Sequence, residues 1–246
     1  MNKQFFHIFS WKGIVMLILI AILLSGCVYG NEIKQQNAPA TSEFIGVVQS
    51  AVDQYIKRNG VPPIQNKEQD TPIYEKYLVD FSKLRNYNMI STVPANAFEN
   101  NGTAIYVLVN VEIKPEVKLM DLPSYQQMVE LQREVNTYIK KNGTLPRGDK
   151  VAEHFYQLSM DKLSLKKKQI QSPYSHQLLE IVIHDSGRIA IDYTPELLKA
   201  MNKSGLQPSD DSMLDLRSIL VEQAFFVPAW SYPYHWKDNQ PTISEQ

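Results

Sequence analysis

The stretch YIKRNGVPPI (residues 55–64) returns later in the chain, with few changes, as YIKKNGTLPR (residues 138–147). At this spacing of 83 positions, residues 48–63 and 131–146 are identical at eight of sixteen positions. We assign the shared residues to packing and helix capping, because the repeated stretch has no group suited to catalysis. Internal repetition of this kind indicates a duplicated structural unit. The sequence therefore predicts two units of similar fold.

Each copy of the repeated stretch is predicted to end a helix. We expect Ser42 to cap the first helix, and Ser124 with Gln127 to form a capping box at the start of the second. Gly60 and Gly143 are expected to close the helices in the left-handed conformation. The apolar residues at helical spacing are Ile45, Val48, Val52, Tyr55 and Ile56 in the first copy and Met128, Leu131, Val135, Tyr138 and Ile139 in the second.

Strand-like segments follow each predicted helix. Residues 103–113 are rich in residues that favour strands, and residues 178–184 are predicted to form a hairpin with residues 188–193. Before these strands we expect short helices, capped by Thr71 in one unit and by Asp149 in the other. The predicted fold class is therefore α+β, with two tandem units that each lay a helix on a small antiparallel sheet.

The C-terminal part is predicted to differ from the repeats. We expect a helix capped by Ser209 or Asp210 that ends near Gln223, followed by the extended aromatic stretch FFVPAWSYPYHW (residues 225–236). Its rings could stack on a glycan or a peptide, or they could cover a sheet face. The binding interpretation assigns a surface to Trp230, Tyr232, Tyr234 and Trp236. The last seven residues are expected to fray.

The amino terminus has the basic and then apolar pattern of a signal peptide. GIVMLILIAILLSG (residues 13–26) precedes Cys27, the only cysteine, and its apolar core is shorter than the roughly 20 residues of a membrane-spanning helix. LSGC (residues 24–27) resembles the lipobox of bacterial lipoproteins, in which a diacylglyceryl group is attached to the cysteine before cleavage. The resemblance implies lipidation of Cys27 and a location on the outer face of the cytoplasmic membrane. The alternative is an ordinary secretory signal with a chance cysteine.

As a whole the chain resembles membrane lipoproteins of Gram-positive bacteria. Residues 44–113 also resemble the soluble half of type IV pilins and pseudopilins, on a long helix, an NG sequence with proline, and VDFSKL (residues 79–84) before a strand with tyrosine. Filament assembly is not implied, because those proteins keep an uncleaved apolar helix. The expected domains are a signal peptide (1–26), a flexible tether (27–43), two repeat units (44–120 and 121–204), and a C-terminal helix with aromatic extension (205–246).

The charge balance argues against nucleic acid as a partner. Without residues 1–26, which contain two lysines and no acidic residue, the chain has 23 basic and 26 acidic residues. Binding to a phosphate backbone requires a concentrated basic surface. The only run of three basic residues is residues 166–168. We expect the partners to be the membrane, through the lipid, and an envelope protein or cell-wall component.

No motif identifies an active site. His154, His176, His184 and His235 lack the spacing of zinc ligands, so no metal or cofactor is expected. Ser172, His176, Asp185, Ser186 and Asp192 are the residue types of a hydrolase triad, without a surrounding GxSxG or SxxK. Two hypotheses remain. One is a non-enzymatic envelope module that binds through its repeat sheets or aromatic tail, and the other is an envelope hydrolase whose site is assembled from scattered residues. A solute-binding lipoprotein is disfavoured, because two small units offer less cleft than two large lobes.

Overall fold

The structure is a computed structural model that describes residues 32–165, 169–206, 208 and 214–245. The chain divides into two compact units, Met1–Glu43 and Phe44–Gln246, and the fold described here is that of the second. Among the residues described, no helix has both the length and the hydropathy needed to cross a membrane. Three predictions lie outside these residues: the signal peptide with Cys27, the basic run at 166–168, and the cap at Ser209 or Asp210.

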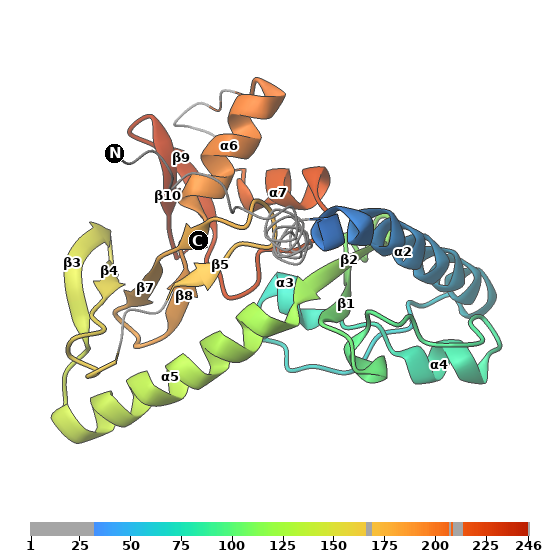
Figure 1. Cartoon of the computed structure of the whole chain (residues 1–246), viewed down its shortest axis with the longest axis horizontal. Coiled ribbons are helices and arrows are strands. Elements are labelled where there is room, and N and C mark those ends of the chain that lie inside the picture. The colour runs from blue at the N-terminus through green and yellow to red at the C-terminus, as the bar shows by residue number, and fades with distance from the viewer. Residues whose placement is uncertain (1–31, 166–168, 207, 209–213, 246) are drawn as a thin grey trace, which may run out of the picture. The chain divides into compact units, whose positions relative to one another are not determined.

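The first repeat is a helix packed on a hairpin, as predicted (Figure 1). The helix α2 (Glu32–Asn59) buries Val48, Val52 and Tyr55 against β1 (Ala104–Val109) and β2 (Glu116–Asp121). Between helix and hairpin the chain forms α3 (Ile73–Lys76), α4 (Phe81–Asn86) and the 3-10 helix η2 (Phe98–Asn100).

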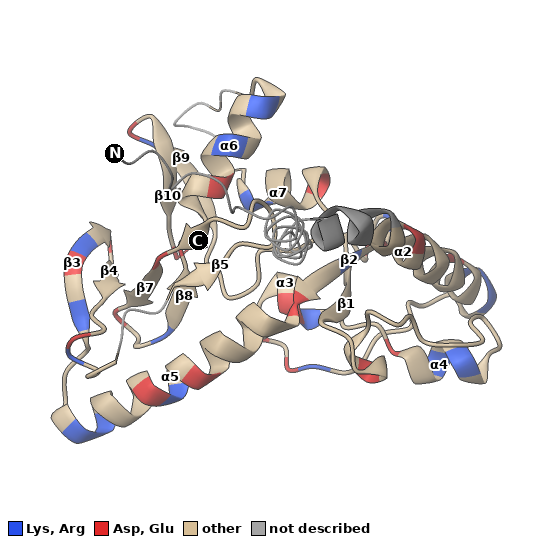
Figure 2. Cartoon of the chain, viewed as in Figure 1, with Lys and Arg blue, Asp and Glu red and all other residues tan. Residues whose placement is uncertain are grey.

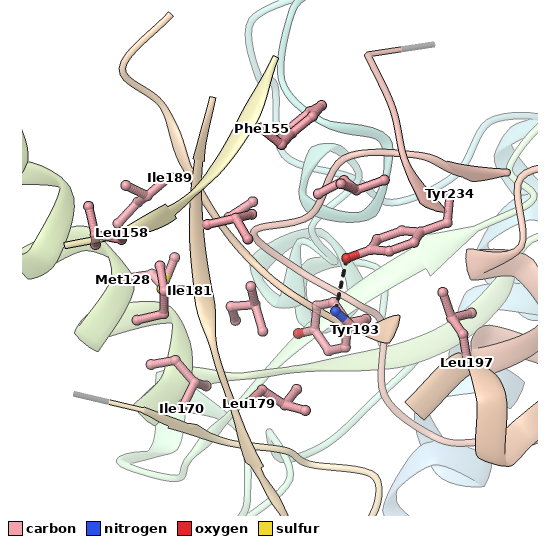
Figure 3. Close-up of a cluster of buried hydrophobic side chains, with 14 of the residues drawn as sticks. Met128, Phe155, Leu158, Ile170, Leu179, Ile181, Ile189, Tyr193, Leu197 and Tyr234 are labelled. Carbon is pink, nitrogen blue, oxygen red and sulfur yellow. Dashed lines mark hydrogen bonds between the residues drawn. The ribbon is translucent and has the colours of Figure 1, made fainter. Parts of the chain in front are cut away.

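The second repeat follows the same plan, with a sheet of four strands in place of the two-stranded hairpin. Its helix α5 (Leu122–Asn142) packs Met128, Leu131 and Val135 onto a four-stranded antiparallel sheet, which has the order β3-β4-β7-β8. Figure 3 shows the core that results. The strands are β3 (Arg147–Ala152), β4 (Phe155–Leu158), β7 (Ile181–His184) and β8 (Ile189–Ile191), with a small pair, β5 (Ile170–Gln171) and β6 (Leu178–Leu179), beside them. The predicted tandem α+β architecture is thus confirmed.

The repeats share individual side-chain hydrogen bonds. In the first repeat the Gln49 Oε1 atom accepts the Val117 N–H at 2.7 Å, and in the second the Gln132 Oε1 atom accepts the Ile189 N–H at 2.9 Å. The Nε2 atom of each glutamine donates to the carbonyl oxygen two residues earlier in the hairpin, at 3.0 and 2.9 Å. Because Gln49 and Gln132 are equivalent in the sequence repeat, Val117 and Ile189 are equivalent positions of the two hairpins.

The equivalence extends to the segments between helix and hairpin. The Lys83 Nζ atom donates to the Ile64 carbonyl at 2.7 Å, and the Lys162 Nζ atom donates to the Arg147 carbonyl at the same distance. The second repeat contains the strand pairs β3–β4 and β4–β7. At the equivalent places the first repeat has single antiparallel bridges between residues. These bridges join Ile64 to Val79 and Leu78 to Val107. The first repeat therefore contains the same four-segment meander in shorter form.

We expect the substitutions Gln49→Leu and Gln132→Leu to destabilise the protein by similar amounts. Each leaves a buried backbone N–H of the hairpin without its partner, because Val117 is 3% and Ile189 0% exposed. An unpaired buried donor costs about 1–3 kcal/mol. Urea denaturation measures the loss, with the exposed Gln54→Leu on α2 as the control. A clear loss in only one of the two repeats would contradict their equivalence.

Both predicted helix ends are confirmed, but both predicted starts are wrong. Gly60 and Gly143 have φ angles of 75° and 66°, and their N–H groups donate to carbonyl oxygens four residues back. The helix α2 begins at Glu32, so Ser42 lies inside it and residues 32–43 of the expected tether are helical. The cap of α5 is Asp121, whose carboxylate accepts both the N–H and the Oγ–H of Ser124. An aspartate three residues before that N–H has the usual geometry of an N-cap.

Two further local predictions are corrected. Asp149 does not cap a short helix but lies within the exposed strand β3. The other expected short helix exists as α3, but the prediction that Thr71 caps it is wrong, because Pro72 occupies the cap position. The last residues do not all fray. β9 (Tyr234–Lys237) turns through Asp238 and Asn239, both with positive φ, into β10 (Gln240–Ile243). Two residues in left-handed conformation suit a tight hairpin turn.

The C-terminal region begins with two helices and then bonds to both sheets. α6 (Thr194–Ser204) and α7 (Arg217–Gln223) lead into residues 225–231, here named the strap. The Leu119 N–H donates to the Phe225 carbonyl, and the Ile191 N–H donates to the Trp230 carbonyl, each at 2.8 Å. Leu119 and Ile191 each lie two residues beyond the equivalent positions Val117 and Ile189. The strap thus bonds to the last strand of both repeats at the same place.

Candidate functional site

The two repeats carry hollows at equivalent places. The first groove has a volume of about 890 Å³, and its lining includes Leu78 and Ile105. The second groove has a volume of about 420 Å³, and its lining includes Gln157 and Glu180. Leu78 and Gln157 are equivalent, since they pair with Val107 of β1 and Val182 of β7. Ile105 and Glu180 lie two residues before those partners, so these two positions of the floors are also equivalent.

The floors differ in chemistry although their backbones correspond. Leu78 and Ile105 are partly exposed in the first repeat, where the second has the exposed polar residues Gln157 and Glu180. Met120 also lines the first groove. It corresponds to Asp192 of the second repeat, because Met120 follows Leu119 and Asp192 follows Ile191, the two residues whose N–H groups bond to the strap. A solvent-facing sheet surface is ordinarily polar. An apolar floor within a hollow is instead typical of a binding site, which makes the first groove the candidate site.

Two carboxylates in the first groove have raised pKa values. The Glu75 Oε1 atom accepts the Trp230 N–H at 2.8 Å, which ties α3 to the strap, and burial raises the pKa of Glu75 above its usual value. Burial also raises the pKa of Glu99, the residue after Phe98 on η2. Burial without a closely paired cation disfavours the charged form of a carboxylate. The Arg188 and Arg217 charges favour the ionised form of Glu75, but they do not outweigh the effect of burial on its pKa.

The side chains that line the first groove are more acidic than basic. Glu68 also lines it, and Lys67 is the one basic residue among the described lining residues. Figure 2 shows α3 with one acidic and one basic residue side by side, and these are Glu75 and Lys76. The Lys76 Nζ atom donates to the Gln69 carbonyl at 2.8 Å and is not among the residues that line the hollow. The lining therefore carries three acidic side chains and one basic side chain.

A histidine cluster lies at the turns of the second sheet. The His184 Nδ1 atom is 2.8 Å from the Ser186 Oγ atom and accepts the Ser186 N–H, while its Nε2 atom contacts the Glu245 carboxylate. Acceptance at Nδ1 places the proton of the neutral ring on Nε2. His154 lies beside this group, its Nδ1 atom 2.9 Å from the Asp185 carboxylate. The structure thus brings together a serine, a histidine and an acid in the order of a triad.

The remaining residues of the predicted triad set are not in that cluster. Ser172 is fully buried and its Oγ atom accepts the Tyr174 N–H, and the His176 N–H donates to the Ser172 carbonyl in the same turn. Asp192 accepts hydrogen bonds from the Thr194 N–H and the Tyr234 hydroxyl. These groups serve turns and helix starts.

His235 lines a cavity of about 380 Å³ with His154, and the described residues contain no group of three or more suitable side chains that could hold a metal ion.

We expect the contact between His154 and Asp185 to depend on pH. The hydrogen bond to Asp185 raises the pKa of His154 above its ordinary 6.5, and the same bond lowers the pKa of Asp185 below its ordinary 3.8. The stabilisation is therefore complete between these ordinary values, and is lost as pH rises through the raised pKa of His154 or falls through the lowered pKa of Asp185. An NMR titration should place the His154 midpoint above 6.5, and Asp185→Asn should lower it. A midpoint at or below 6.5 in the unaltered protein would contradict the contact.

The aromatic residues predicted as a binding surface have unequal surroundings. Tyr234 is 0% exposed and its hydroxyl accepts the Tyr193 N–H, so it belongs to the core (Figure 3). Trp230, Tyr232 and Trp236 are partly buried and pack against the same core. Tyr232 also has its ring 5.0 Å from the Arg188 guanidinium. A binding role for these three side chains stays a prediction.

The geometry of the described residues defines a duplicated α+β module with an apolar groove in its first repeat, and a family comparison points to the same part of the chain. Residues 41–121 match the family model of the YphF family N-terminal domain. That match spans the first repeat and every residue that lines the first groove except Tyr125. No curated protein and no solved structure matches the chain. The lipoprotein and pseudopilin resemblances therefore stay predictions.

Proposed function

We propose that this protein is a membrane-anchored extracytoplasmic lipoprotein that acts as a non-enzymatic binding module of the cell envelope, with the first groove as its binding surface. The supporting observation is the difference between the two floors. Leu78, Ile105 and Met120 are apolar where the equivalent residues of the second repeat are polar. Met120 is buried, whereas Leu78 and Ile105 are partly exposed, and partly exposed apolar side chains in a hollow cost solvation free energy that a bound partner recovers.

The anchoring half of the proposal rests on the lipobox resemblance at Cys27. Two acyl chains hold a protein far more firmly than one myristoyl group. Metabolic labelling with a palmitate analogue should modify the unaltered chain, and Cys27→Ala should abolish the label and release the protein from membranes. Mass spectrometry that found an unmodified thiol and an intact leader would overturn this half.

The binding half is tested by photocrosslinking from native membranes. A benzoylphenylalanine at Phe98, which is 54% exposed and lines the first groove, should capture a defined partner. The matched control places the same group at Gln157, exposed in the second groove. Capture at Phe98 should disappear in Ile105→Glu, a change that installs the residue tolerated at the equivalent position of the second repeat. Identical products from both positions, or none from Phe98, would overturn the proposal.

The alternative is an envelope hydrolase, and one contact favours it. The Ser186 Oγ atom lies 2.8 Å from a His184 nitrogen, and the other ring nitrogen contacts Glu245. Ser186 also occupies the hairpin turn between β7 and β8, where the same contacts have a structural explanation. A fluorophosphonate probe decides between them, because a hydrolase should be labelled and lose the label in Ser186→Ala and in His184→Ala. We expect no labelling.

A further inference from the structure

The first groove has the chemistry to select a particular kind of partner. We infer that its occupant is a polypeptide segment of a protein partner that presents a lysine or arginine next to an apolar side chain. This inference rests on the proposed function. It adds the chemical class of the ligand, which neither the apolar floor nor the family match specifies.

The floor favours a polypeptide over a glycan. Leu78, Ile105 and Met120 offer no hydrogen-bonding side-chain group. The hydroxyl groups of a sugar placed there would lose water without gaining partners, which costs free energy for each group. An apolar side chain of a peptide has no such requirement and gains by leaving water. The volume of about 890 Å³ lies within the range of ligand sites.

The walls favour a cation beside that apolar side chain. Glu68, Glu75 and Glu99 line the groove with Lys67 as the one basic side chain among its described lining residues. Among the described residues, the Glu75 carboxylate accepts one hydrogen bond, from the Trp230 N–H to its Oε1 atom, and the Arg188 and Arg217 charges favour its ionised form without offsetting its burial. A lysine or arginine of the partner would pair with charge that has been taken partly out of water. An acidic segment would meet repulsion at the same place.

The second groove provides an internal control for this argument. It also contains carboxylates, Asp149, Asp161 and Glu180. Its apolar lining residues Leu158 and Ile181 are buried, and at the positions equivalent to Leu78 and Ile105 it has the exposed polar residues Gln157 and Glu180. Negative charge alone is therefore common to both repeats. Of the two grooves, the first is the one that combines the partly exposed apolar pair Leu78 and Ile105 with partly buried carboxylates. A ligand that needs both features should distinguish between them.

The test uses the full chain in a neutral detergent and three fluorescent peptides that alternate leucine with lysine, glutamate or glutamine. Fluorescence anisotropy should show binding of the leucine–lysine peptide, at least about tenfold weaker binding of the leucine–glutamine peptide, and none of the leucine–glutamate peptide. Glu75→Gln and Glu99→Gln should each weaken the leucine–lysine peptide several-fold or more, and added salt should weaken it further. Glu75→Gln keeps an oxygen that can accept the Trp230 N–H, so the groove is retained. The matched control Glu180→Gln in the second groove should change nothing.

Equal binding of the lysine and glutamine peptides, or equal loss in Glu180→Gln, would overturn the inference. So would displacement of the Phe98 crosslink by cell-wall glycan fragments but not by the leucine–lysine peptide. In those cases capture of a partner at Phe98 would still support the proposed function. If Phe98 captures no partner, both the inference and the proposed function fail.

Discussion

Replacement of Tyr234 by alanine is expected to lower the free energy of unfolding by about 3–5 kcal/mol, the usual cost of removing a buried aromatic side chain. Tyr234 is 0% exposed and lies in the core of the second repeat with Phe155 and Leu197. Its hydroxyl accepts the Tyr193 N–H at 2.9 Å and donates to Asp192 at 3.1 Å. Urea denaturation of the full chain in detergent, with tyrosine or tryptophan fluorescence as the signal, measures the loss.

The conservative change Tyr234→Phe separates the ring from the hydroxyl. It keeps the packing but leaves the Tyr193 N–H without its partner, so we expect a loss of about 1–3 kcal/mol. The same pair of changes distinguishes the core from a binding surface. A stacking platform exposed to a glycan would tolerate Tyr234→Ala with little change in stability, and that result would contradict the position of Tyr234 in the structure.

The second large effect is expected at Arg217, at the start of α7. Its side chain is buried, donates from Nε and Nη2 to the Asp215 carboxylate at 2.9 and 2.7 Å, and donates from Nη1 to the Ser231 hydroxyl at 2.9 Å. The guanidinium also lies 5.0 Å from the centre of the Tyr74 ring in the first repeat. Arg217 therefore joins α7, the strap and α3.

We expect Arg217→Ala to destabilise the protein by about 3 kcal/mol, because breaking a buried pair leaves its partner uncompensated. The value is at the low end of the usual range, since the Asp215 side chain is 32% exposed. Arg217→Lys keeps the charge but not the planar fork, and should lose a smaller part. A loss below about 1 kcal/mol in Arg217→Ala, measured by urea denaturation, would show that the network contributes little.

The duplicated architecture could be predicted from the sequence because the patterns that indicate it are formed by residues close together in the chain. The spacing of Val48, Val52 and Tyr55 defines a helical face, and Gly60 is suited to the left-handed end of a helix. The starts of the helices were harder to predict, because Ser42 and Ser124 are both acceptable caps and the choice depends on the neighbours. At α5 the carboxylate of Asp121 provides the cap, and the Ser124 hydroxyl donates to it.

The strap and the C-terminal hairpin could not be predicted in their roles. The contacts of Phe225 and Trp230 join residues more than 30 positions apart, and no local pattern specifies such partners. An aromatic segment has the same composition whether it covers a core or binds a ligand. The sequence therefore predicts Tyr234 among the binding residues, although its side chain is buried.

The candidate groove was missed for a different reason. Leu78 and Ile105 look like ordinary strand residues until they are compared with Gln157 and Glu180, and the repeats beyond residue 64 are too divergent to align without the hydrogen-bond pattern. Once the hydrogen bonds of the structure show which residues of the two repeats are equivalent, the sequence shows apolar residues in the first repeat at positions where the second has polar ones. Glu75 became visible only through its contact with Trp230, which lies 155 positions away.

Cysteine labelling on intact cells tests the central claim most directly, namely that the first groove is an occupied binding surface outside the cytoplasmic membrane. Phe98→Cys and Gln157→Cys place single reactive thiols at exposed positions of the first and second grooves, and the unaltered chain, whose one cysteine is proposed to carry the lipid, gives the background. With a membrane-impermeant maleimide, Gln157→Cys should react on intact cells while Phe98→Cys is protected, and both should react after purification. Equally rapid reaction of the two thiols on intact cells, or no reaction of either until the cells are broken, would contradict the account.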